Sequence, residues 1–356
     1  MMLPIGLSLF SFGYLGGFAR REHERHQPAL SVEQLLALAR THGLAGIELP
    51  LARCYPGLPE DELRALCERL AASGLFLSID AEVVDDETVD PTLRAAAALG
   101  EPFIRVKLSK ILGGNRYQSH LSWKAWFEAA CRRLAPVAAR ARDHGVAIAI
   151  ENHQDVTSEE LVRLIREVGE DVVGVNLDTG STLATCEDPA VFAKAVAPYI
   201  RNVHLKDYRL YRGPGGFRLV RCPLGHGVIN FQEIFQTLDR VPHAPRASIE
   251  LGAVVAREVH WLEARYWDAY PPRTVAQMIP FLRLLFARME PDDGDRWQTP
   301  WELGASHEVL ERTELEELFE SVRFLASLGR GVTPEIGRPL HALSELQGDV
   351  TGVPRR

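Results

Sequence analysis

Four residues of metal-binding type occur at regular places in the second half of the chain. Glu151, Asp178, His204 and Glu250 are separated by 27, 26 and 46 positions, and each follows a short apolar run. Three carboxylates brought close together would repel one another unless a cation were present. Oxygen-rich sets with one imidazole favour Mn²⁺, Mg²⁺ or Co²⁺. The pattern predicts one divalent metal ion, although each residue taken alone is also typical of a solvated strand end.

The apolar runs before these residues have the composition of buried strands. They are rich in β-branched and small side chains, as in parallel sheets covered on both faces, and they span 146–150, 172–175, 200–203 and 247–249. Segments between them carry helix signals; Thr157 precedes an amphipathic stretch over 159–168 that Gly169 closes. This repeat predicts an α/β fold, a TIM (β/α)8 barrel, in which strand ends meet at one rim. The four side chains would then converge on one volume.

Length and composition allow one large barrel with an extension. The repeat is complete at the helix predicted for 273–287, so we assign residues 1–288 to the barrel and 289–356 to a C-terminal extension. The stretch 308–328 predicts an acidic amphipathic helix. Such a helix cannot bury its apolar face alone and must pack on the barrel or on a second chain. The scattered Gly and Pro of the last 25 or so residues predict a surface tail.

Charge and composition exclude several classes of protein. The net charge of −8 disfavours a nucleic-acid surface, which needs clustered Lys and Arg. The chain contains no run of about 18 apolar residues and no basic region before its first apolar run, which predicts neither a membrane span nor a secretory signal. Five cysteines without a CxxC pair predict reduced thiols. We therefore expect a cytoplasmic protein with no nucleic-acid or membrane partner.

Other charged residues near predicted strand ends are candidates for binding a substrate. Lys206 shares a strand face with His204 by the two-residue period. Lys107 ends a strand in which it alternates with Arg105 and apolar residues, and it is suited to hold an anionic group. An ion pair with Glu48 or another rim carboxylate, Asp80 or Glu151, is an equal alternative. Glu48 itself is interpreted either as a contact to a substrate hydroxyl or as a rim carboxylate whose polar partners lie within the protein.

Two long segments leave alternatives open. The stretch 208–222 contains four arginines and is predicted as a loop, either a mobile basic flap or a solvated hairpin. The stretch 252–272 contains Trp261, Tyr266, Trp267 and Tyr270. These aromatic residues predict either a lid over the site or a contact with a neighbouring subunit. A homo-oligomer would form through this aromatic loop or through the C-terminal helix.

Several motifs resemble one family. The most specific are 150–153 (IENH), 176–180 (NLDTG), 203–207 (VHLKD) and 249–252 (IELG), with weaker support from 46–49 (GIEL) and 224–227 (LGHG). Over residues 4–288 the chain resembles the xylose isomerase-like TIM barrels, a group of sugar phosphate isomerases and epimerases. The resemblance implies that Glu151, Asp178, His204 and Glu250 hold one divalent cation, often Mn²⁺. It further implies that Glu151 and Glu250 exchange a substrate proton from opposite faces.

Two positions depart from the family pattern. Epimerases of this group often have a histidine three residues after the aspartate ligand, where this chain has Ser181. The glycine pair at 225 and 227 often encloses a glutamate, and here it encloses His226. Both departures concern the substrate rather than the metal set.

The sequence as a whole predicts a metal-dependent isomerase or epimerase of a small ketose or keto sugar derivative, acting through a metal-stabilised enediolate. Glu151 and Glu250 would exchange the proton, and Lys206 would neutralise developing charge. The residues predicted to bind the substrate are His153, Lys107, Glu48 and His226, with orientation of Glu151 as the alternative for His153. A decarboxylase or dehydratase of a sugar-derived keto acid passes through a related enolate. An apurinic-endonuclease-like phosphodiesterase and a non-catalytic sugar-binding barrel are further alternatives.

Overall fold

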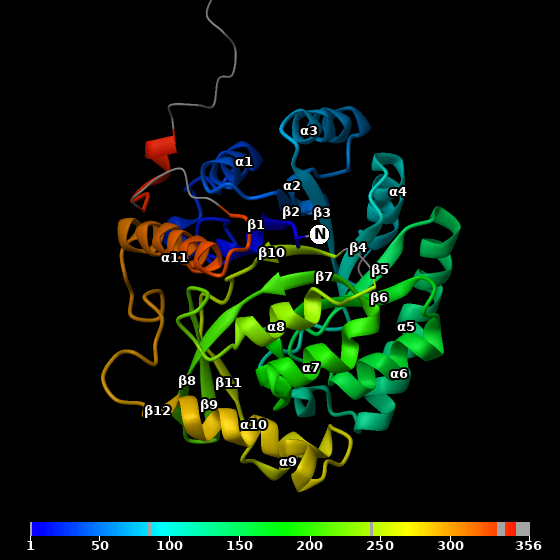
Figure 1. The fold of residues 1–356 in the computed structure, drawn as a ribbon, viewed down its shortest axis with the longest axis vertical. Coiled ribbons are helices and arrows are strands. Elements are labelled where there is room, and N and C mark those ends of the chain that lie inside the picture. Colours follow the sequence, from blue (N-terminus) through cyan, green and yellow to red (C-terminus); the bar gives the residue numbers. More distant parts are fainter. Residues whose placement is uncertain (1, 85–86, 243–244, 333–338, 347–356) are drawn as a thin grey trace, which may run out of the picture.

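Parallel strands close into a barrel in the computed structural model, which describes residues 2–84, 87–242, 245–332 and 339–346 (Figure 1). Around the barrel the order is β1-β10-β7-β6-β5-β4-β3-β2, and β2 pairs with β1. The strands are β1 (Ile5–Ser8), β2 (Gly46–Pro50), β3 (Phe76–Val83), β4 (Phe103–Lys107), β5 (Ala147–Glu151), β6 (Val173–Asp178), β7 (Ile200–Leu205) and β10 (Arg246–Ile249). The predicted TIM barrel is confirmed.

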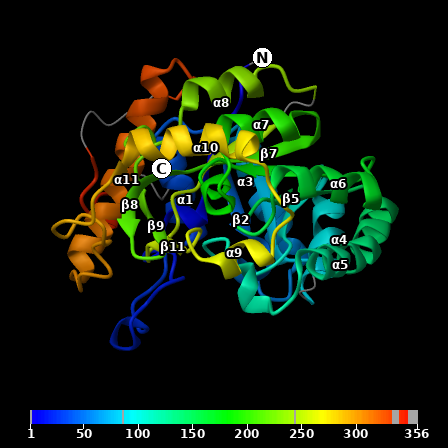
Figure 2. The ribbon, with the colours of Figure 1, turned by 90° about the horizontal axis from the view of Figure 1, so that it is seen from below.

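Helices cover the outside of the barrel, as Figures 1 and 2 show. Capping residues define several of them. The Thr157 side chain accepts a hydrogen bond from the backbone of Glu160 at the start of α6, and Gly145 ends α5 in the left-handed conformation. The helices around the barrel are α1 (Val32–Thr41), α2 (Leu51–Cys54), α3 (Glu60–Ala72), α4 (Val89–Leu99), α5 (Trp123–His144), α6 (Ser158–Val168), α7 (Pro189–Val196), α8 (Phe231–Leu238), α9 (Ala264–Asp268) and α10 (Val275–Arg288).

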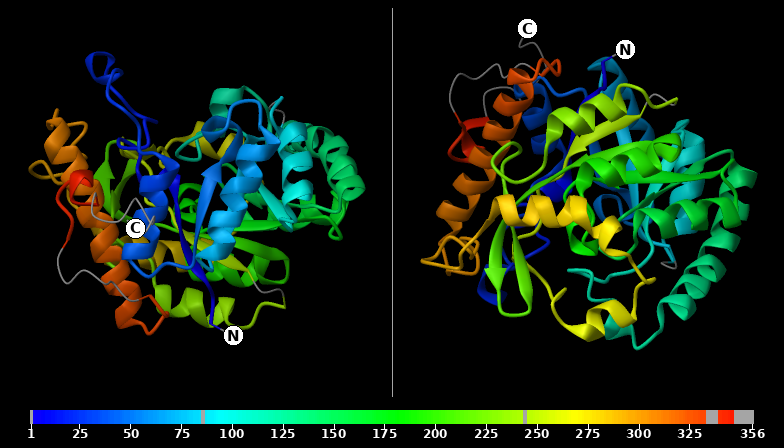
Figure 3. Two further views of the ribbon diagram at one scale, coloured as in Figure 1. Left: turned by 90° about the horizontal axis from the view of Figure 1, so that it is seen from above. Right: turned by 60° about the horizontal axis from the view of Figure 1, so that its bottom comes forward.

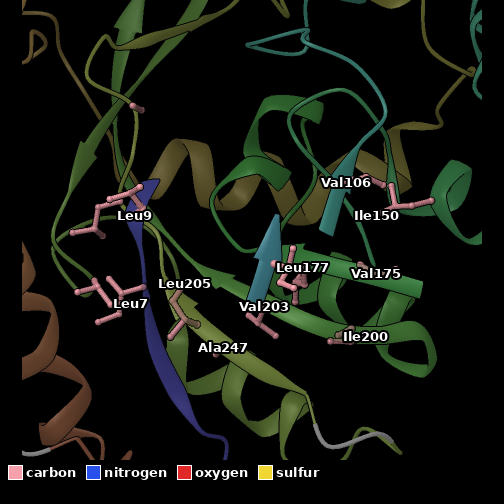
Figure 4. Packing of buried hydrophobic residues seen from close by; sticks show 14 of the residues in the cluster. Leu7, Leu9, Val106, Ile150, Val175, Leu177, Ile200, Val203, Leu205 and Ala247 are labelled. Atoms are coloured by element: carbon pink, nitrogen blue, oxygen red, sulfur yellow. The ribbon is translucent and has the colours of Figure 1, made fainter. Parts of the chain in front are cut away.

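Residues alternate along the strands between an apolar outer face and a polar interior. Val203 and Leu205 of β7 belong to the apolar core between the barrel and its helices (Figure 4). The intervening side chains of Asn202 and His204 bond instead to Glu48 of β2 across the barrel. Successive residues of a strand point to opposite faces of the sheet, so every second side chain of each strand points into the barrel. The interior at this end of the barrel is therefore a polar network.

The strand register aligns the predicted metal ligands at one end of the barrel. Asp178 in β6 lies opposite His204 in β7, and His204 lies opposite Ser248 in β10. Glu250 follows Ser248 by two residues and shares its face. Glu151 is the last residue of β5. All four residues thus come to the carboxyl ends of the strands, where TIM barrels hold their active sites.

A second, smaller sheet flanks the barrel on the side away from α4 and α5 (Figure 2). It consists of β8 (Asp207–Gly213), β9 (Gly216–Cys222), β11 (Arg257–Val259) and β12 (Met289–Glu290). The stretch 208–222 is a hairpin, which was one of the two alternatives predicted for it, but its antiparallel strands β8 and β9 are mostly buried rather than solvated. Two of its arginines face acidic residues of the C-terminal extension. Arg218 pairs with Glu302, and Arg221 pairs with Glu314.

Helix α11 (His307–Ser327) packs on the barrel of its own chain, beside α1 (Figures 1 and 3). The apolar positions predicted for this helix are buried: Leu310, Leu315, Leu318, Val322 and Leu325. The Glu314 carboxylate accepts hydrogen bonds from the backbone of Tyr14 and Leu15, and the Ser321 hydroxyl accepts one from the backbone of Leu224. Of the two packing partners predicted for this helix, it uses the barrel. The end of the predicted surface tail, residues 347–356, lies outside the described residues.

The five cysteines are free thiols, in agreement with the prediction from their number and spacing. Among the described residues, no helix combines the length and the apolar character required to cross a bilayer.

Candidate functional site

Three of the four predicted ligands meet at the carboxyl end of the barrel. Glu151, Asp178 and His204 are completely buried, and each offers one ligand atom within 4.8 Å of the others. Ligand bonds to divalent cations are about 2.0–2.6 Å long, so this spacing is close to that of atoms sharing one ion. Glu250 is not part of this group of three. Its Oε2 nevertheless lies 3.7 Å from Nδ1 of His204, so it borders the same centre.

The Asp178 carboxylate is held by the turn that follows β6. Its Oδ1 accepts hydrogen bonds of 2.9 Å from the backbone N–H groups of Gly180 and Ser181. The side chain of Asn152 bonds both the N–H and the C=O of Asp178, which ties the end of β5 to the end of β6. Oδ2 is left to face the centre. Ser181, which stands where the family often has a histidine, is buried beside this carboxylate.

The His204 ring is oriented by Glu48. Its Nε2 lies 2.6 Å from Glu48 Oε1, and Glu48 Oε2 accepts hydrogen bonds from Ser248 and Asn202. Because a carboxylate only accepts hydrogen bonds, Nε2 carries the proton and Nδ1 is aimed at Glu151, 3.7 Å away. Burial opposes protonation of His204, but the negative charges of Glu48, Glu151 and Glu250 outweigh it and raise its pKa to about 9.

Two buried cations hold the carboxylates together. Arg105 contacts Asp80 at 2.6 Å and also pairs with Glu151. Lys206 Nζ lies 3.1 Å from Asp178 Oδ2 and 2.5 Å from Glu250 Oε2. Arg105 thus faces the barrel interior in ion pairs.

The donor set fits a divalent metal ion. Within the described residues, Glu151 Oε1, Asp178 Oδ2 and His204 Nδ1 are buried and form no hydrogen bond, although Lys206 Nζ lies 3.1 Å from Asp178 Oδ2. Buried polar atoms without a partner are costly, and native proteins rarely leave several of them together. Two carboxylate oxygens and one imidazole nitrogen are ligands that Mg²⁺, Mn²⁺ and Co²⁺ accept. A cation among them would satisfy all three atoms.

A cavity of about 250 Å³ opens directly above this centre. Glu151, Glu250 and Lys206 line it, so two carboxylates and one ammonium group can touch a molecule bound there. The remaining lining combines charged, polar and aromatic residues from the strand ends and from the segments after β1, β4 and β10: Phe10, Gly13, Phe18, Ala19, Arg105, Lys107, Leu112, His153, Gln154, Gly252, Ala253, Val254, Val255 and Arg257.

The structure brings two of the four predicted substrate-binding residues to this cavity. His153 lines it with Nδ1 lacking a hydrogen bond, and burial together with the neighbouring cations holds its pKa well below the usual range, so it is neutral. Lys107 also lines it while pairing with Glu82 at 3.3 Å. Glu48 does not line the cavity, because it is buried beneath the site against His204. His226 is exposed in the turn after β9 and does not line the cavity either.

The predicted aromatic lid does not lie over the cavity. Tyr266 and Tyr270 are buried against their own chain, where their hydroxyls donate hydrogen bonds to the carbonyls of Ala184 and Gly114. None of the four aromatic side chains lines the cavity. Arg257, five residues after Gly252, reaches it instead. Sequence reasoning missed Arg257, and the only available signal was a basic residue between the last ligand motif and the aromatic residues.

The model of one known family, described as xylose isomerase-like TIM barrel, matches residues 36–267. The chain belongs to this family. The match lies within the barrel and ends before the C-terminal extension, and it agrees with the resemblance inferred from the sequence motifs.

Two related proteins match about two thirds of the chain. The uncharacterized protein YihM of Escherichia coli is 26% identical over 229 residues, which cover 63% of this chain and 67% of YihM. The 3-oxo-isoapionate decarboxylase of Pectobacterium atrosepticum is 22% identical over 238 residues, or 66% of this chain and 81% of that enzyme.

Solved structures with the same fold come from proteins of different kinds. The probable 3-DHS dehydratase AsbF of Bacillus anthracis aligns with a TM-score of 0.53 at 19% identity, covering 70% of this chain and 92% of its own. An L-ribulose 3-epimerase aligns with a TM-score of 0.50 at 20% identity, and the alignment covers 71% of this chain and 82% of the epimerase. A Mycobacterium smegmatis protein of this family, solved in complex with magnesium, aligns with a TM-score of 0.51 at 21% identity, covering 80% and 97%.

Proposed function

We propose that this protein is a metal-dependent isomerase or epimerase of a small ketose or keto sugar derivative. One observation carries the proposal: Glu151 and Glu250 line the same cavity, and their Oε2 atoms each lie 3.7 Å from His204 Nδ1. Two carboxylates placed around one bound molecule can exchange its proton on two faces.

The two carboxylates have opposite protonation preferences. Burial opposes ionisation of Glu151, but the charges of Arg105 and His204 outweigh it and lower its pKa. Burial raises the pKa of Glu250 to about 7, against the opposing charge of Lys206. A pair of titratable groups whose pKa values are pushed apart is the usual arrangement of a base with an acid. We assign proton exchange to this pair, because both carboxylates line the cavity and can reach a bound molecule.

Glu151, Asp178 and His204 would hold the metal, with Glu250 as the fourth ligand and Mn²⁺ as the expected ion; Mg²⁺ and Co²⁺ suit the same ligands. When bound, the cation supplies Lewis-acid stabilisation of negative charge on the substrate oxygens, a contribution of several kcal/mol. The magnesium bound to a family member of the same fold supports a divalent ion at such a site.

The protein residues would perform the proton transfers. Glu151 removes a proton from the carbon next to the carbonyl, and the electrons of that C–H bond form the C=C bond of an enediolate. Glu250 then delivers its proton to the opposite face, so that no atom is gained or lost. The ammonium group of Lys206, 2.5 Å from Glu250, neutralises the developing charge, while neutral His153 binds a substrate hydroxyl.

Decarboxylation or dehydration of a sugar-derived keto acid is the second candidate. Four cationic side chains line the cavity, a composition that suits an acidic substrate, and the relative from Pectobacterium atrosepticum is a decarboxylase. An endonuclease-like phosphodiesterase is less well supported. A multi-metal cluster would need free ligands at β2 and β3, where Glu48 and Asp80 are engaged with His204 and Arg105.

The test is to incubate the Mn²⁺-supplemented protein in D₂O with ketoses, their phosphates and keto acids, and to follow each by NMR. Isomerisation or epimerisation exchanges one C–H for C–D and leaves the carbon skeleton intact. Release of CO₂ would support the decarboxylase, and loss of water the dehydratase. Glu250→Gln should reduce exchange by at least about 100-fold. Metal binding without turnover on any of these compounds would support a binding protein and sink the proposal.

A further inference from the structure

Four cationic side chains line the cavity, and three of them already have carboxylate partners. Arg105 pairs with Asp80 and Glu151, and Lys107 and Lys206 pair with other carboxylates. Arg257 is the exception. In the described part of the chain its guanidinium makes no ion pair, and its buried Nε makes no hydrogen bond.

Two carboxylates beside this strand are engaged elsewhere: Glu258, the next residue, and Glu302, which binds the backbone of the residue before Arg257. Glu258 faces Arg218 at 3.4 Å and His260 at 3.6 Å. Glu302 binds Arg218 through one oxygen and accepts a hydrogen bond from the backbone of Ala256 through the other. The positive charge of Arg257 is consequently left without compensation on the cavity wall.

The backbone that carries Arg257 is anchored on both sides. Arg257 begins β11 and pairs with Leu219 of β9 in the second sheet. The hydroxyl of Thr299 donates a 2.6 Å hydrogen bond to the carbonyl of Val254, three residues earlier. A guanidinium on a fixed strand keeps its position without a ligand, and this reduces the entropy lost when a ligand binds.

A second unpartnered donor belongs to the residue two positions after Lys206 in the chain. The Tyr208 hydroxyl is completely buried and makes no hydrogen bond among the described residues. Burial raises the pKa of Tyr208 to about 12, and the positive charges of Lys206 and Arg257 act against this rise. Tyr208 does not itself line the cavity, whereas Arg257 does.

We propose that Arg257 is an anion-binding residue of the cavity and that the molecule bound there carries a carboxylate or a phosphate group. This inference rests on the proposed function, because it takes the occupant of the cavity to be the substrate. A guanidinium matches both anions with two parallel hydrogen bonds. Arg257 is half-buried with an unpartnered Nε, and an anionic ligand would supply the acceptors that its guanidinium lacks. The substrate class is accordingly a keto sugar acid or a keto sugar phosphate rather than a neutral sugar.

Calorimetric titration of the full-length Mn²⁺-loaded protein tests the assignment with three probes, D-fructose, D-fructose 6-phosphate and 2-keto-D-gluconate. At least one anionic probe should bind more tightly than fructose, and the stronger anion identifies phosphate or carboxylate as the group recognised. Arg257→Gln should weaken the binding of that anion by about 10- to 100-fold and leave the affinity for fructose unchanged. Arg257→Lys keeps the positive charge but lacks the planar guanidinium. Its affinity for the anion should lie between the affinities of the parent protein and of Arg257→Gln.

Arg212→Gln is the matched control, because Arg212 is an exposed cation of the same sheet that does not line the cavity. It should bind every probe like the parent protein. If Arg257→Gln lost affinity equally for the neutral and the anionic probes, the role of Arg257 would be structural and the proposal would be overturned. A parent protein that bound neither anion more tightly than fructose would also overturn it. Because binding is measured without turnover, an anion preference without deuterium exchange would refute the proposed function alone.

Discussion

Glu48 and His204 meet across the interior of the barrel, with 2.6 Å between Glu48 Oε1 and His204 Nε2. They lie on β2 and β7, which are not neighbours in the sheet. Ser248 and Asn202 bind the other oxygen of Glu48, so the carboxylate is fixed from three directions. This contact decides which nitrogen of His204 faces the predicted metal centre. Of the two interpretations of Glu48, the structure agrees with the carboxylate that is satisfied within the protein and not with the substrate contact.

Glu48→Gln should therefore weaken metal binding. A glutamine can rotate its amide N–H toward Nε2, which would place the proton of His204 on Nδ1 and block it as a ligand. Loss of such a partner typically lowers metal affinity by about 10- to 100-fold. Calorimetric titration with Mn²⁺ measures the change.

The matched control is Glu33→Gln, which removes a half-exposed carboxylate that pairs with Arg69 on the surface. Its Mn²⁺ affinity should equal that of the parent protein. An unchanged Mn²⁺ affinity in Glu48→Gln would mean that His204 needs no partner or is not a ligand.

Metal binding should stabilise the folded protein and depend on Asp178. A ligand that binds only the folded state at 100 times its Kd adds about 2.7 kcal/mol to the free energy of unfolding. Mn²⁺ should raise the melting temperature, and a chelator should reverse this rise. Asp178→Asn keeps the hydrogen bonds of Oδ1 to the turn but removes the charge, so it should lose the Mn²⁺-dependent rise. A full rise in Asp178→Asn would place the metal elsewhere.

Short-range patterns in the sequence predicted much of this structure. The strands before Glu151, Asp178 and His204 and the buried leucines of α11 follow from local periodicity, which one chain displays directly. The contact of Glu48 with His204 joins positions 156 residues apart, and no local pattern encodes it. The glycines and four arginines of residues 208–222 predict a basic flap or a solvated hairpin. The acidic partners that bury two of those arginines lie about 80 to 100 residues further along the chain.

Glu314 is predicted to support the cavity wall from the C-terminal extension. Its carboxylate accepts hydrogen bonds of 2.8 and 2.9 Å from the backbone of Tyr14 and Leu15 and pairs with Arg221. The segment it holds follows Phe10 and precedes Phe18, which both line the cavity. Glu314→Gln should lower the free energy of unfolding by about 1–3 kcal/mol, because a buried charged contact is lost. It should also raise the KM of whichever substrate is found, since the wall is less well ordered.

Urea unfolding and steady-state kinetics measure the two effects of Glu314→Gln. Glu320→Gln is the control on the same helix, because among the described residues Glu320 pairs with Arg323 alone, at the surface. It should change neither quantity by a measurable amount. A destabilised Glu314→Gln protein with an unaltered KM would limit the role of Glu314 to stability.

Asp155 should make the stability of the protein depend on pH near neutrality. Burial raises its pKa to about 7, while hydrogen bonding to Ser109 acts in the opposite direction. The folded state therefore retains a proton that the unfolded chain releases near pH 4. The retained proton contributes to the free energy of unfolding fully below that pH, and this contribution is lost as pH rises through about 7. The contribution is at most about 4 kcal/mol. Asp155→Asn stays neutral at every pH and should lose less stability than the parent protein between pH 5 and 8, whereas the exposed control Asp143→Asn should follow the parent. If the free energy of unfolding changed with pH in the same way in the parent protein and in Asp155→Asn over that range, Asp155 would be ionised in the folded protein.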